Sequence, residues 1–275
     1  MGHSPVQRYY GPARQRGKSD EPGRIRRPDH SPCGRYDRQS EDHSGRSKIQ
    51  FLTGGAMHRL MFIIACLLIA TLVAAQAPKP NARDIKLVGD RFKPLTWDEM
   101  TPAQKTMMEH LVAGTRGGAG GPFNVLLRSP EMGDLAQEFG GATRFRSSLP
   151  RKLNEMAIII TARYWTAQYE WNAHRKAAAD NGLNESIIQA IAAGKKPASM
   201  DAAETVVYNF STELLNTKHV SDALFKAAVD KFGERGVVDL MGVIGWYQFV
   251  SSLLNVDRYP LPEGAKPELQ ALKSE

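Results

Sequence analysis

The apolar side chains after Pro150 recur with helical spacing, and this pattern constrains the fold more than any other feature of the chain. Proline often opens a helix, and the apolar positions that follow it share one face of a helix with 3.6 residues per turn: Leu153, Met156, Ala157, Ile159 and Ile160. A second helix is expected from about Ala167 to Asn181, because Asn181-Gly182 is an ordinary helix end.

Further helix signals occupy residues 98–262. Thr101-Pro102 combines a hydroxyl N-cap with proline in the first turn and predicts a helix to about Ala113. A helix over Glu131–Phe139 is expected to close at Gly140-Gly141. The other expected helices begin near Asn184 or Ser186, at Asp201, at Ser221 (ending at Phe232-Gly233) and near Glu234. No stretch alternates like a strand, so the sequence predicts an all-α domain of about seven or eight helices.

The first 56 residues do not look globular. They contain eleven Lys/Arg and six Asp/Glu, scattered Gly, Pro and Ser, and no apolar periodicity. Such a segment buries too little apolar surface to offset its ordering entropy. We expect either a disordered basic leader or upstream sequence that is assigned to the protein because the start codon is set too early. The alternative is a nucleic-acid-binding arm, which the mixed charges disfavour.

Residues 57–76 have the layout of a secretory signal peptide. Met57 and Arg59 begin a short basic region, an apolar core runs from Leu60 to Val73, and small residues follow at Ala74 and Ala75. The run is shorter than the roughly 20 apolar residues of a spanning helix. If translation starts at Met57, the protein is expected to be exported, to the periplasm or the medium, with membrane contact only through this segment.

Charge and cysteine content differ between the leader and the rest of the chain. The net charge of the whole chain is +7, but residues 77–275 hold 24 Lys/Arg and 23 Asp/Glu, so we expect no nucleic-acid partner for the domain. Both cysteines, Cys33 and Cys66, precede residue 77. The part after the signal peptide therefore has no thiol nucleophile and no cysteine ligand. Residues 77–97 are read as an extended, proline-containing lead-in and residues 263–275 as a polar tail.

Ionisable side chains are densest between Leu149 and Leu183. Glu170 and His174 are four residues apart and meet on one helix face. A carboxylate beside an imidazole holds its tautomer and raises its basicity, as acid/base work near neutral pH requires. Glu155 would lie roughly 28 Å from His174 on one unbroken helix. We therefore expect the chain to turn back around Trp165–Gln168. The alternative is a surface ion pair that contributes only about 0.3 kcal/mol.

This stretch resembles the carboxymuconolactone decarboxylase and AhpD-like family, in which a Glu precedes a Cys-x-x-Cys-x-x-x-His motif. Glu155 takes the place of the upstream Glu and His174 that of the final His, while the cysteine positions fall on Ala167 and Glu170. Neither residue can form the thiolate that a peroxidase of the family needs. The decarboxylase branch lacks the cysteine pair and carries a Glu four residues before the His, as here.

The resemblance covers roughly residues 90–262 and implies an AhpD-like helical fold, a homo-oligomer, and a cofactor-independent carbon–carbon lyase. Its substrate would be a small organic acid or lactone that supplies its own electron sink. In this reading His174 is proton donor and acceptor, Glu170 orients it, Glu155 is a relay, and Arg163 clamps the substrate carboxylate. Further substrate contacts are expected from Trp171, Tyr169 and, in the glycine-rich loop Gly114–Pro122, Arg116.

Several alternatives stay open at this point. Trp171 and Tyr169 could be structural, and Arg163 could pair with Glu155 or Glu170 instead of substrate. The glycine-rich loop lacks the GK[ST] of a phosphate cradle and is expected at the rim of a pocket. No second His or Asp at ligand spacing accompanies His174, so no metal site is expected. The resemblance implies that no cofactor is needed either, because the substrate supplies its own electron sink. An AhpD-type peroxidase, peroxiredoxin-like in activity, and a non-catalytic secreted binding module are the alternative functions.

Overall fold

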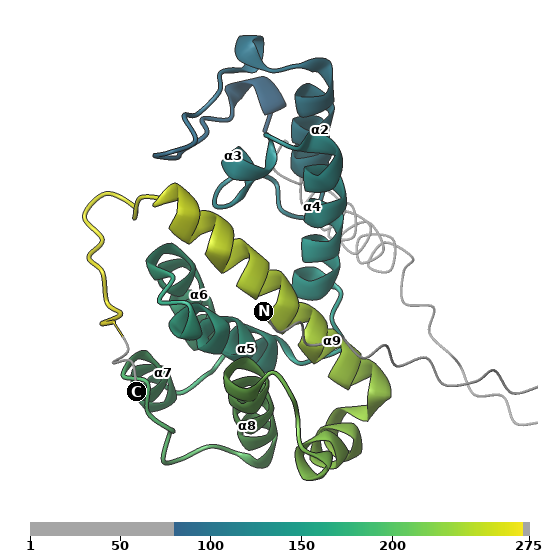
Figure 1. Ribbon diagram of the computed structural model, residues 1–275, viewed down its shortest axis with the longest axis vertical. Coiled ribbons are helices and arrows are strands. Elements are labelled where there is room, and N and C mark those ends of the chain that lie inside the picture. The colour runs from purple at the N-terminus through teal and green to yellow at the C-terminus, as the bar shows by residue number, and fades with distance from the viewer. Residues whose placement is uncertain (1–79, 272–275) are drawn as a thin grey trace, which may run out of the picture. The chain divides into compact units, whose positions relative to one another are not determined.

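The computed structural model describes residues 80–271 (Figure 1). The predicted leader (1–56), signal peptide (57–76) and first residues of the lead-in lie outside the described residues, as do residues 272–275. All described residues belong to one compact unit.

The described part of the chain is all-α, as predicted, and within residues 80–271 it has eight α-helices, two short 3-10 helices and no strand. In chain order the elements are η1 (Ala82–Asp84), η2 (Trp97–Glu99), α2 (Pro102–Ala113), α3 (Phe123–Leu126), α4 (Pro130–Phe145), α5 (Arg151–Tyr164), α6 (Gln168–Asp180), α7 (Glu185–Ala192), α8 (Ala202–Thr217) and α9 (Asp222–Asp257).

Most helix ends lie at the capping residues that the sequence indicates. The Thr101 side chain accepts a hydrogen bond from the backbone N–H of Gln104 at the start of α2, and Asp201 does the same with Glu204 at the start of α8. Both are capping boxes, because the residue at the third position also returns a bond to the cap. α9 is interrupted at Gly233, where φ is 69°. Glycine adopts this backbone without a steric penalty, so the predicted helix end at Gly233 is found as a break within α9.

The predicted end of α4 is wrong, because the helix continues through Gly140-Gly141 to Phe145. Gly140 serves close packing: a Cβ there would lie 2.4 Å from Cζ2 of Trp246 and 2.5 Å from Nη2 of Arg116. The missing side chain lets α9 and the glycine-rich loop approach α4. The four residues beyond the expected end also bring Arg144 into the fold, next to the His174 region.

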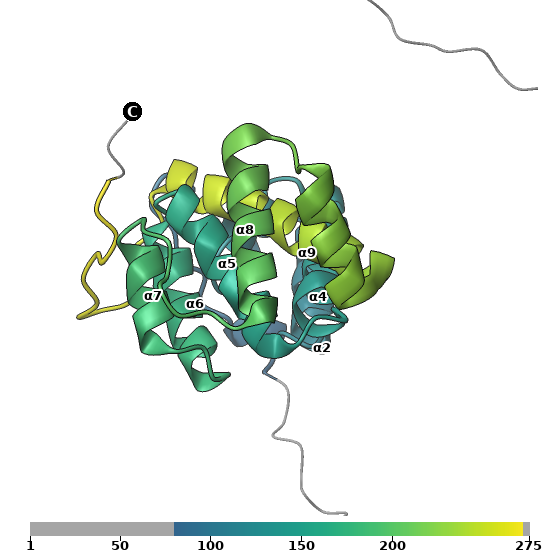
Figure 2. The same cartoon turned by 90° about the horizontal axis from the view of Figure 1, so that it is seen from below.

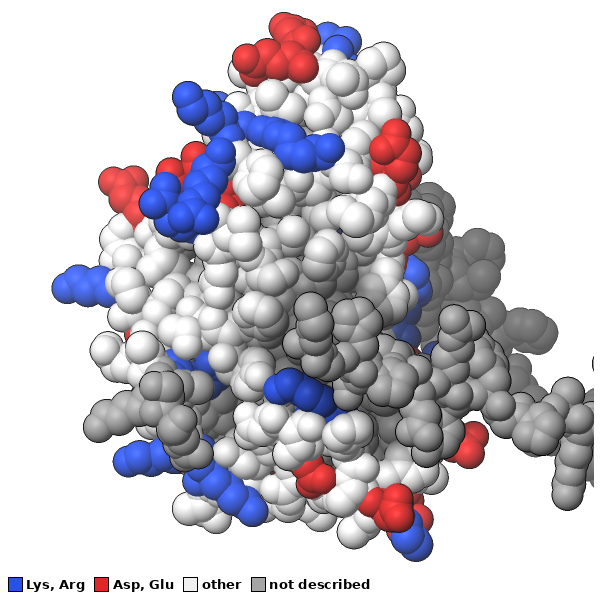
Figure 3. All heavy atoms as spheres, viewed as in Figure 1, with Lys and Arg blue, Asp and Glu red and all other residues white. Residues whose placement is uncertain are grey.

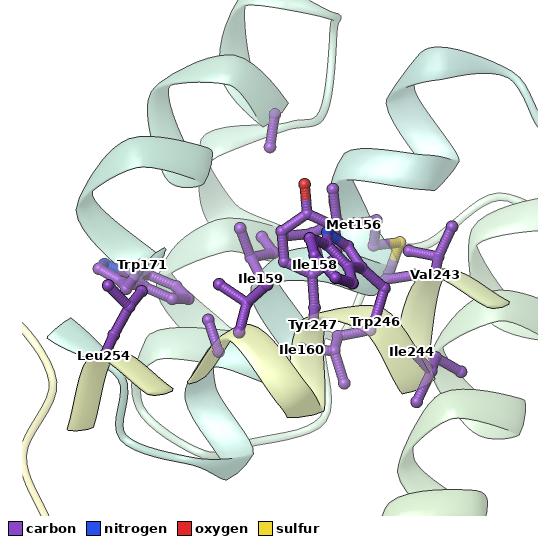
Figure 4. Packing of buried hydrophobic residues seen from close by; sticks show 14 of the residues in the cluster. Met156, Ile158, Ile159, Ile160, Trp171, Val243, Ile244, Trp246, Tyr247 and Leu254 are labelled. Carbon is purple, nitrogen blue, oxygen red and sulfur yellow. The ribbon is translucent and has the colours of Figure 1, made fainter. Parts of the chain in front are cut away.

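α5 is buried along 11 of its 14 residues and organises the core. It packs against α6, α8 and α9, whereas α2 packs against α4, and α4 against α9 (Figures 1 and 2). Figure 4 shows Met156 and Ile158 of α5 beside Tyr247 and Trp246 of α9. Each fully buried aliphatic side chain contributes roughly 2 kcal/mol relative to an exposed one. α9 is long and apolar enough to span a membrane, but half of its most apolar window is buried inside this fold.

The segment after α9 packs against α6, although it belongs partly to the predicted polar tail. The Gln168 side-chain amide donates to the carbonyl of Leu269 and its oxygen accepts from the backbone N–H groups of Glu268 and Leu269. Leu269 is buried, and the Trp171 indole donates to Glu268 at 3.0 Å. The segment up to residue 271 therefore forms part of the folded unit (Figure 1).

Exposed apolar side chains follow one side of α4 and of α9. They are Met132, Leu135, Phe139, Val238 and Met241. The face drawn in Figure 3 carries Lys/Arg and Asp/Glu side by side, in keeping with the nearly balanced charge of residues 77–275. The homo-oligomer implied by the family resemblance stays a prediction.

Candidate functional site

The turn between α5 and α6 brings Glu155 and His174 together. α5 ends at Tyr164 and α6 begins at Gln168, so the chain reverses where the sequence predicts, through Thr166 at a φ of 48°. Nδ1 of His174 lies 2.5 Å from Oε2 of Glu155, and both side chains are almost completely buried. A short hydrogen bond thus joins two side chains that are nineteen residues apart in the sequence.

Glu170 faces the other nitrogen of the same imidazole. Its Oε1 lies 3.7 Å from Nε2 of His174, which is longer than a hydrogen bond. The sequence predicted that Glu170 orients the ring and that Glu155 acts as a relay. The contacts are arranged the other way round, since Glu155 makes the bond that fixes the ring and Glu170 stands across a gap from Nε2.

The two glutamates titrate in opposite directions. Burial pushes the pKa of Glu155 upward, but the hydrogen bond with His174 and the charges of His174, Arg144 and Arg151 outweigh it, so the pKa of Glu155 is lower than usual. Arg151 Nη2 lies 3.3 Å from the second oxygen of Glu155. Burial also raises the pKa of Glu170, and there it prevails over the neighbouring charges. One carboxyl group therefore favours its charged form and the other its neutral form.

A small cavity of about 90 Å³ opens beside His174. Its walls come from the glycine-rich loop, α3, α4, α6 and α9, and they are formed by Arg116, Gly120, Gly121, Pro122, Phe123, Arg144, Tyr169, Glu170, Ala173, His174, Trp246, Tyr247 and Val250. We call it the His174 cavity. The glycine-rich loop therefore contributes to its wall, at the position where the sequence analysis expected it.

Arg116 presents unused hydrogen-bond donors at this cavity. Its guanidinium lies over the rings of Phe123, Phe145 and Trp246, at 5.0, 5.7 and 6.0 Å. Such ring contacts hold the cation without occupying its N–H groups, and the buried Nε and Nη2 atoms have no hydrogen-bond partner among the described residues. Burial lowers the pKa of Arg116. The arrangement suits an anion that completes these donors.

Arg144 and Tyr247 are cavity residues that the sequence analysis did not find. Nε of Arg144 is buried without a hydrogen-bond partner in the described chain. The ring of Tyr247 stands edge-on to that of His174 with centroids 4.9 Å apart, and burial raises the pKa of its hydroxyl. Continuing α4 beyond its glycine pair would have placed Arg144 one turn after Gly140. Tyr247 lies 73 residues after His174 and carries no local signal.

Arg163 and Trp171 do not reach the His174 cavity. Nη2 of Arg163 donates to the carbonyl of Gln270 at 2.6 Å, and its side chain lines a different pocket. Arg163 follows Glu155 by eight residues, which is roughly 80° around the helix and about 12 Å along it. Trp171 is buried in the core, with its indole N–H bonded to Glu268. These two predicted substrate contacts therefore lie elsewhere.

Tyr169 does line the cavity and is held by aromatic packing. Its ring lies 4.4 Å from that of Tyr259, whose hydroxyl accepts a hydrogen bond from the backbone N–H of Gly121. Burial, with Tyr259 and Glu170 nearby, raises the pKa of Tyr169 to about 12. Tyr169 therefore stays protonated over the neutral range and can donate a hydrogen bond. Within residues 80–271, no group of three or more His, Cys, Asp or Glu side chains is arranged to hold a metal ion.

Comparison with known families agrees with the geometry of this region. Residues 130–213 match the model of the carboxymuconolactone decarboxylase family. The match runs from α4 into α8 and includes Glu155, Glu170 and His174. A search of curated proteins gives no match. The family resemblance found in the sequence is confirmed by this match over residues 130–213, and the all-helical architecture of residues 80–271 is consistent with an AhpD-like helical fold.

Proposed function

We propose that the His174 cavity catalyses the cofactor-independent decarboxylation of a small carboxylic acid, such as a carboxylactone or a related aromatic-derived acid. One observation carries the proposal. An imidazole anchored at Nδ1 by Glu155 turns its Nε2 toward a cavity where two guanidinium groups have N–H donors with no partner in the part of the chain that the structure describes. The membership of residues 130–213 in the carboxymuconolactone decarboxylase family supports the same reaction class.

Substrate binding is assigned to the two arginines. Arg116 and Arg144 offer N–H donors that have no hydrogen-bond partner within residues 80–271, and charge-assisted bonds to a carboxylate are among the stronger hydrogen bonds in proteins. As CO₂ leaves, negative charge moves from the carboxylate onto the substrate carbonyl oxygen. Fixed positive charge in a buried site stabilises that oxyanion without reorganising at the moment of reaction.

Proton delivery is assigned to His174 and Glu170. The ionised Glu155 accepts the Nδ1 hydrogen of His174, which leaves Nε2 as the nitrogen that exchanges protons with substrate. The raised pKa of Glu170 keeps a proton on its carboxyl to higher pH than on an exposed glutamate. After C–C cleavage the carbon that held the carboxylate takes one proton from this pair, and solvent restores it. The net reaction consumes one proton and releases CO₂.

The size of the cavity limits what it accepts. A volume of about 90 Å³ is well below the ~300 Å³ at the lower end of drug-sized sites. A neighbouring pocket of about 470 Å³ shares Arg116 with it. We propose that the reacting carboxylate enters the small cavity while the remainder of the substrate extends past Arg116 into the larger one.

Two other functions are weighed against this one. A peroxidase of the AhpD type requires a thiolate, and the two cysteine positions of the motif hold Ala167 and Glu170. A non-catalytic binding module is favoured by one observation, the small volume beside His174. Against it stands the Glu155–His174 bond, because an anion-binding site needs the arginines but no imidazole with a positioned tautomer.

The test is CO₂ release by the full-length chain from a panel of carboxylactones and aromatic-derived acids. His174→Ala is expected to lower kcat by about 10²–10⁴-fold, the usual loss for a general acid/base residue. His219→Ala, which removes an exposed histidine on another surface, is the matched control. Equal activity of both variants would refute the assignment, and binding without turnover by the wild type would establish the binding module instead.

A further inference from the structure

A second pocket, of about 390 Å³, lies where α5, α7 and α8 end. It is lined by Ile160, Arg163, Tyr164, Ile191, Gly194, Lys195, Lys196, Tyr208, Asn209, Thr212, Leu215 and Asn216, and we call it the α5/α7/α8 pocket. Its volume falls in the range of roughly 300–1,000 Å³ typical of small-molecule sites. It shares no lining residue with the His174 cavity.

The charged residues of this pocket are all basic. Arg163, Lys195 and Lys196 line it, and no Asp or Glu does. None of the three forms an ion pair within residues 80–271. Arg163 is only 5% exposed, and its Nε and Nη1 atoms are buried without a hydrogen-bond partner in the described chain. A buried cation without a counter-charge is costly, so an anion supplied from outside would compensate it.

Helix dipoles do not account for this much positive charge. The C-termini of α5, α7 and α8 meet at the pocket, and each carries an equivalent of about −0.5 charge. Lys218 already compensates the C-terminus of α8, because its Nζ donates to the carbonyls of Leu215 and Asn216. The remaining two termini amount to about −1 against three full positive charges. The pocket therefore carries an excess of positive charge.

The remaining walls indicate what kind of anion fits. Ile160, Ile191 and Leu215 are buried and form an apolar surface. Tyr164 and Tyr208 add two aromatic rings, and burial raises the pKa of Tyr208. A bare inorganic anion would leave this apolar surface unused. A ligand with a flat apolar body and one carboxylate would use both parts.

We propose that the α5/α7/α8 pocket binds a small aromatic carboxylate, with Arg163, Lys195 and Lys196 facing its charge and the tyrosine and aliphatic side chains facing its ring. The site is separate from the His174 cavity and does not depend on decarboxylation. It also gives Arg163 an anion-binding role at a place other than the one that the sequence suggested.

Calorimetric titration of the full-length chain with benzoate, benzamide and inorganic phosphate tests the proposal. Benzoate is expected to bind, and benzamide and phosphate to bind at least tenfold more weakly. The His174 cavity can also take a carboxylate, so the titration is repeated on the Arg116→Met variant. Benzoate binding in the α5/α7/α8 pocket should persist in that variant. Absence of benzoate binding at millimolar concentration, or equal affinity for benzamide, would overturn the proposal.

Variants then locate the site. Lys195→Gln/Lys196→Gln changes two exposed lysines and should weaken benzoate binding about tenfold, as expected for losing bonds to charged groups. The matched control is Lys226→Gln/Lys231→Gln on α9, which removes the same charge from two exposed lysines that do not line the pocket and should leave affinity unchanged. Arg163→Met should weaken binding further, with circular dichroism to verify its fold. Equal effects of the two lysine pairs would place the binding elsewhere and refute the inference.

Discussion

The acidic and basic sides of the His174 cavity differ in how far the protein satisfies its own polar groups. On the acidic side, Glu155 bonds His174 at 2.5 Å and also faces Arg151 at 3.3 Å. On the basic side, Arg116 and Arg144 rest on aromatic rings and keep buried nitrogens without partners in the described chain. The charge of Glu155 is thus compensated by His174 and Arg151 in the free protein, although its Oε1 has no hydrogen-bond partner in the described chain. The unpartnered donors of Arg116 and Arg144, by contrast, are completed only by an anion. The two sides should therefore respond differently to substitution.

The largest expected effect belongs to the acidic side. Glu155→Gln removes the charge that accepts the Nδ1 hydrogen of His174 and should lower kcat by about 10²–10⁴-fold with little change in KM. Steady-state kinetics on the best acid of the panel measure it, with the exposed Glu131→Gln on α4 as control. A rise in KM at constant kcat would show that Glu155 serves binding and would erase the contrast between the two sides.

On the basic side, Arg116→Met should raise KM about 10–100-fold, because a charge-assisted bond to the substrate is lost. It should leave the free energy of unfolding unchanged or slightly higher, since buried donors without partners disappear with the side chain. Kinetics and urea unfolding measure the two effects. Severe destabilisation would mean that Arg116 is already satisfied in the free protein.

Gly140→Ala tests the close packing of α4 against Trp246 and Arg116. Its Cβ would meet Trp246 at 2.4 Å and Arg116 at 2.5 Å, so we expect a loss of about 1–3 kcal/mol in unfolding free energy and weaker anion binding. Gly141→Ala is the matched control, because its nearest neighbour is the end of Arg146 at 3.9 Å. That variant should gain about 0.5–1 kcal/mol from helix propensity. Equal stability of the two variants would contradict the packing argument.

The smallest effect concerns pH. The fold raises the pKa of Glu170, which favours its neutral form. The contribution of Glu170 to the free energy of unfolding is therefore fully present below its pKa in the unfolded chain, and it is lost as the pH rises through its pKa in the folded protein. Glu155 behaves oppositely, since its lowered pKa gives stability above the unfolded pKa that is lost in acid. Glu170→Gln should remove the loss at higher pH, as measured by urea unfolding from acidic to mildly alkaline pH. An unchanged profile would show that the fold does not shift the pKa of Glu170.

The parts of the site that could be predicted are those encoded within one short stretch. The α5–α6 reversal, Glu155, Glu170 and His174 follow from helix periodicity and motif spacing over some thirty residues. Arg144 was missed because a glycine pair usually ends a helix, and here it serves packing against Trp246. Tyr247 comes from a distant helix, and only tertiary packing brings it to the imidazole.

Arg163 illustrates the opposite error. Nearness in sequence placed it beside the two glutamates, but the helical rotation of α5 turns it toward α7, α8 and the chain end. The direction of a helical side chain decides its partners as much as its sequence distance does. The exchanged contacts of Glu155 and Glu170 have the same origin, because an i,i+4 spacing ensures proximity but does not ensure hydrogen-bond geometry.

The hydrogen bonds between α6 and residues 268–269 mean that the segment matched by the family model, residues 130–213, is not a separable module. Truncation after residue 262 would remove the Glu268 acceptor of the Trp171 indole and three hydrogen bonds of the Gln168 side chain. It would also expose the apolar surface that Leu269 covers. α6 also carries His174. Loss of the residues after 262 would therefore weaken the packing of the helix that positions the imidazole.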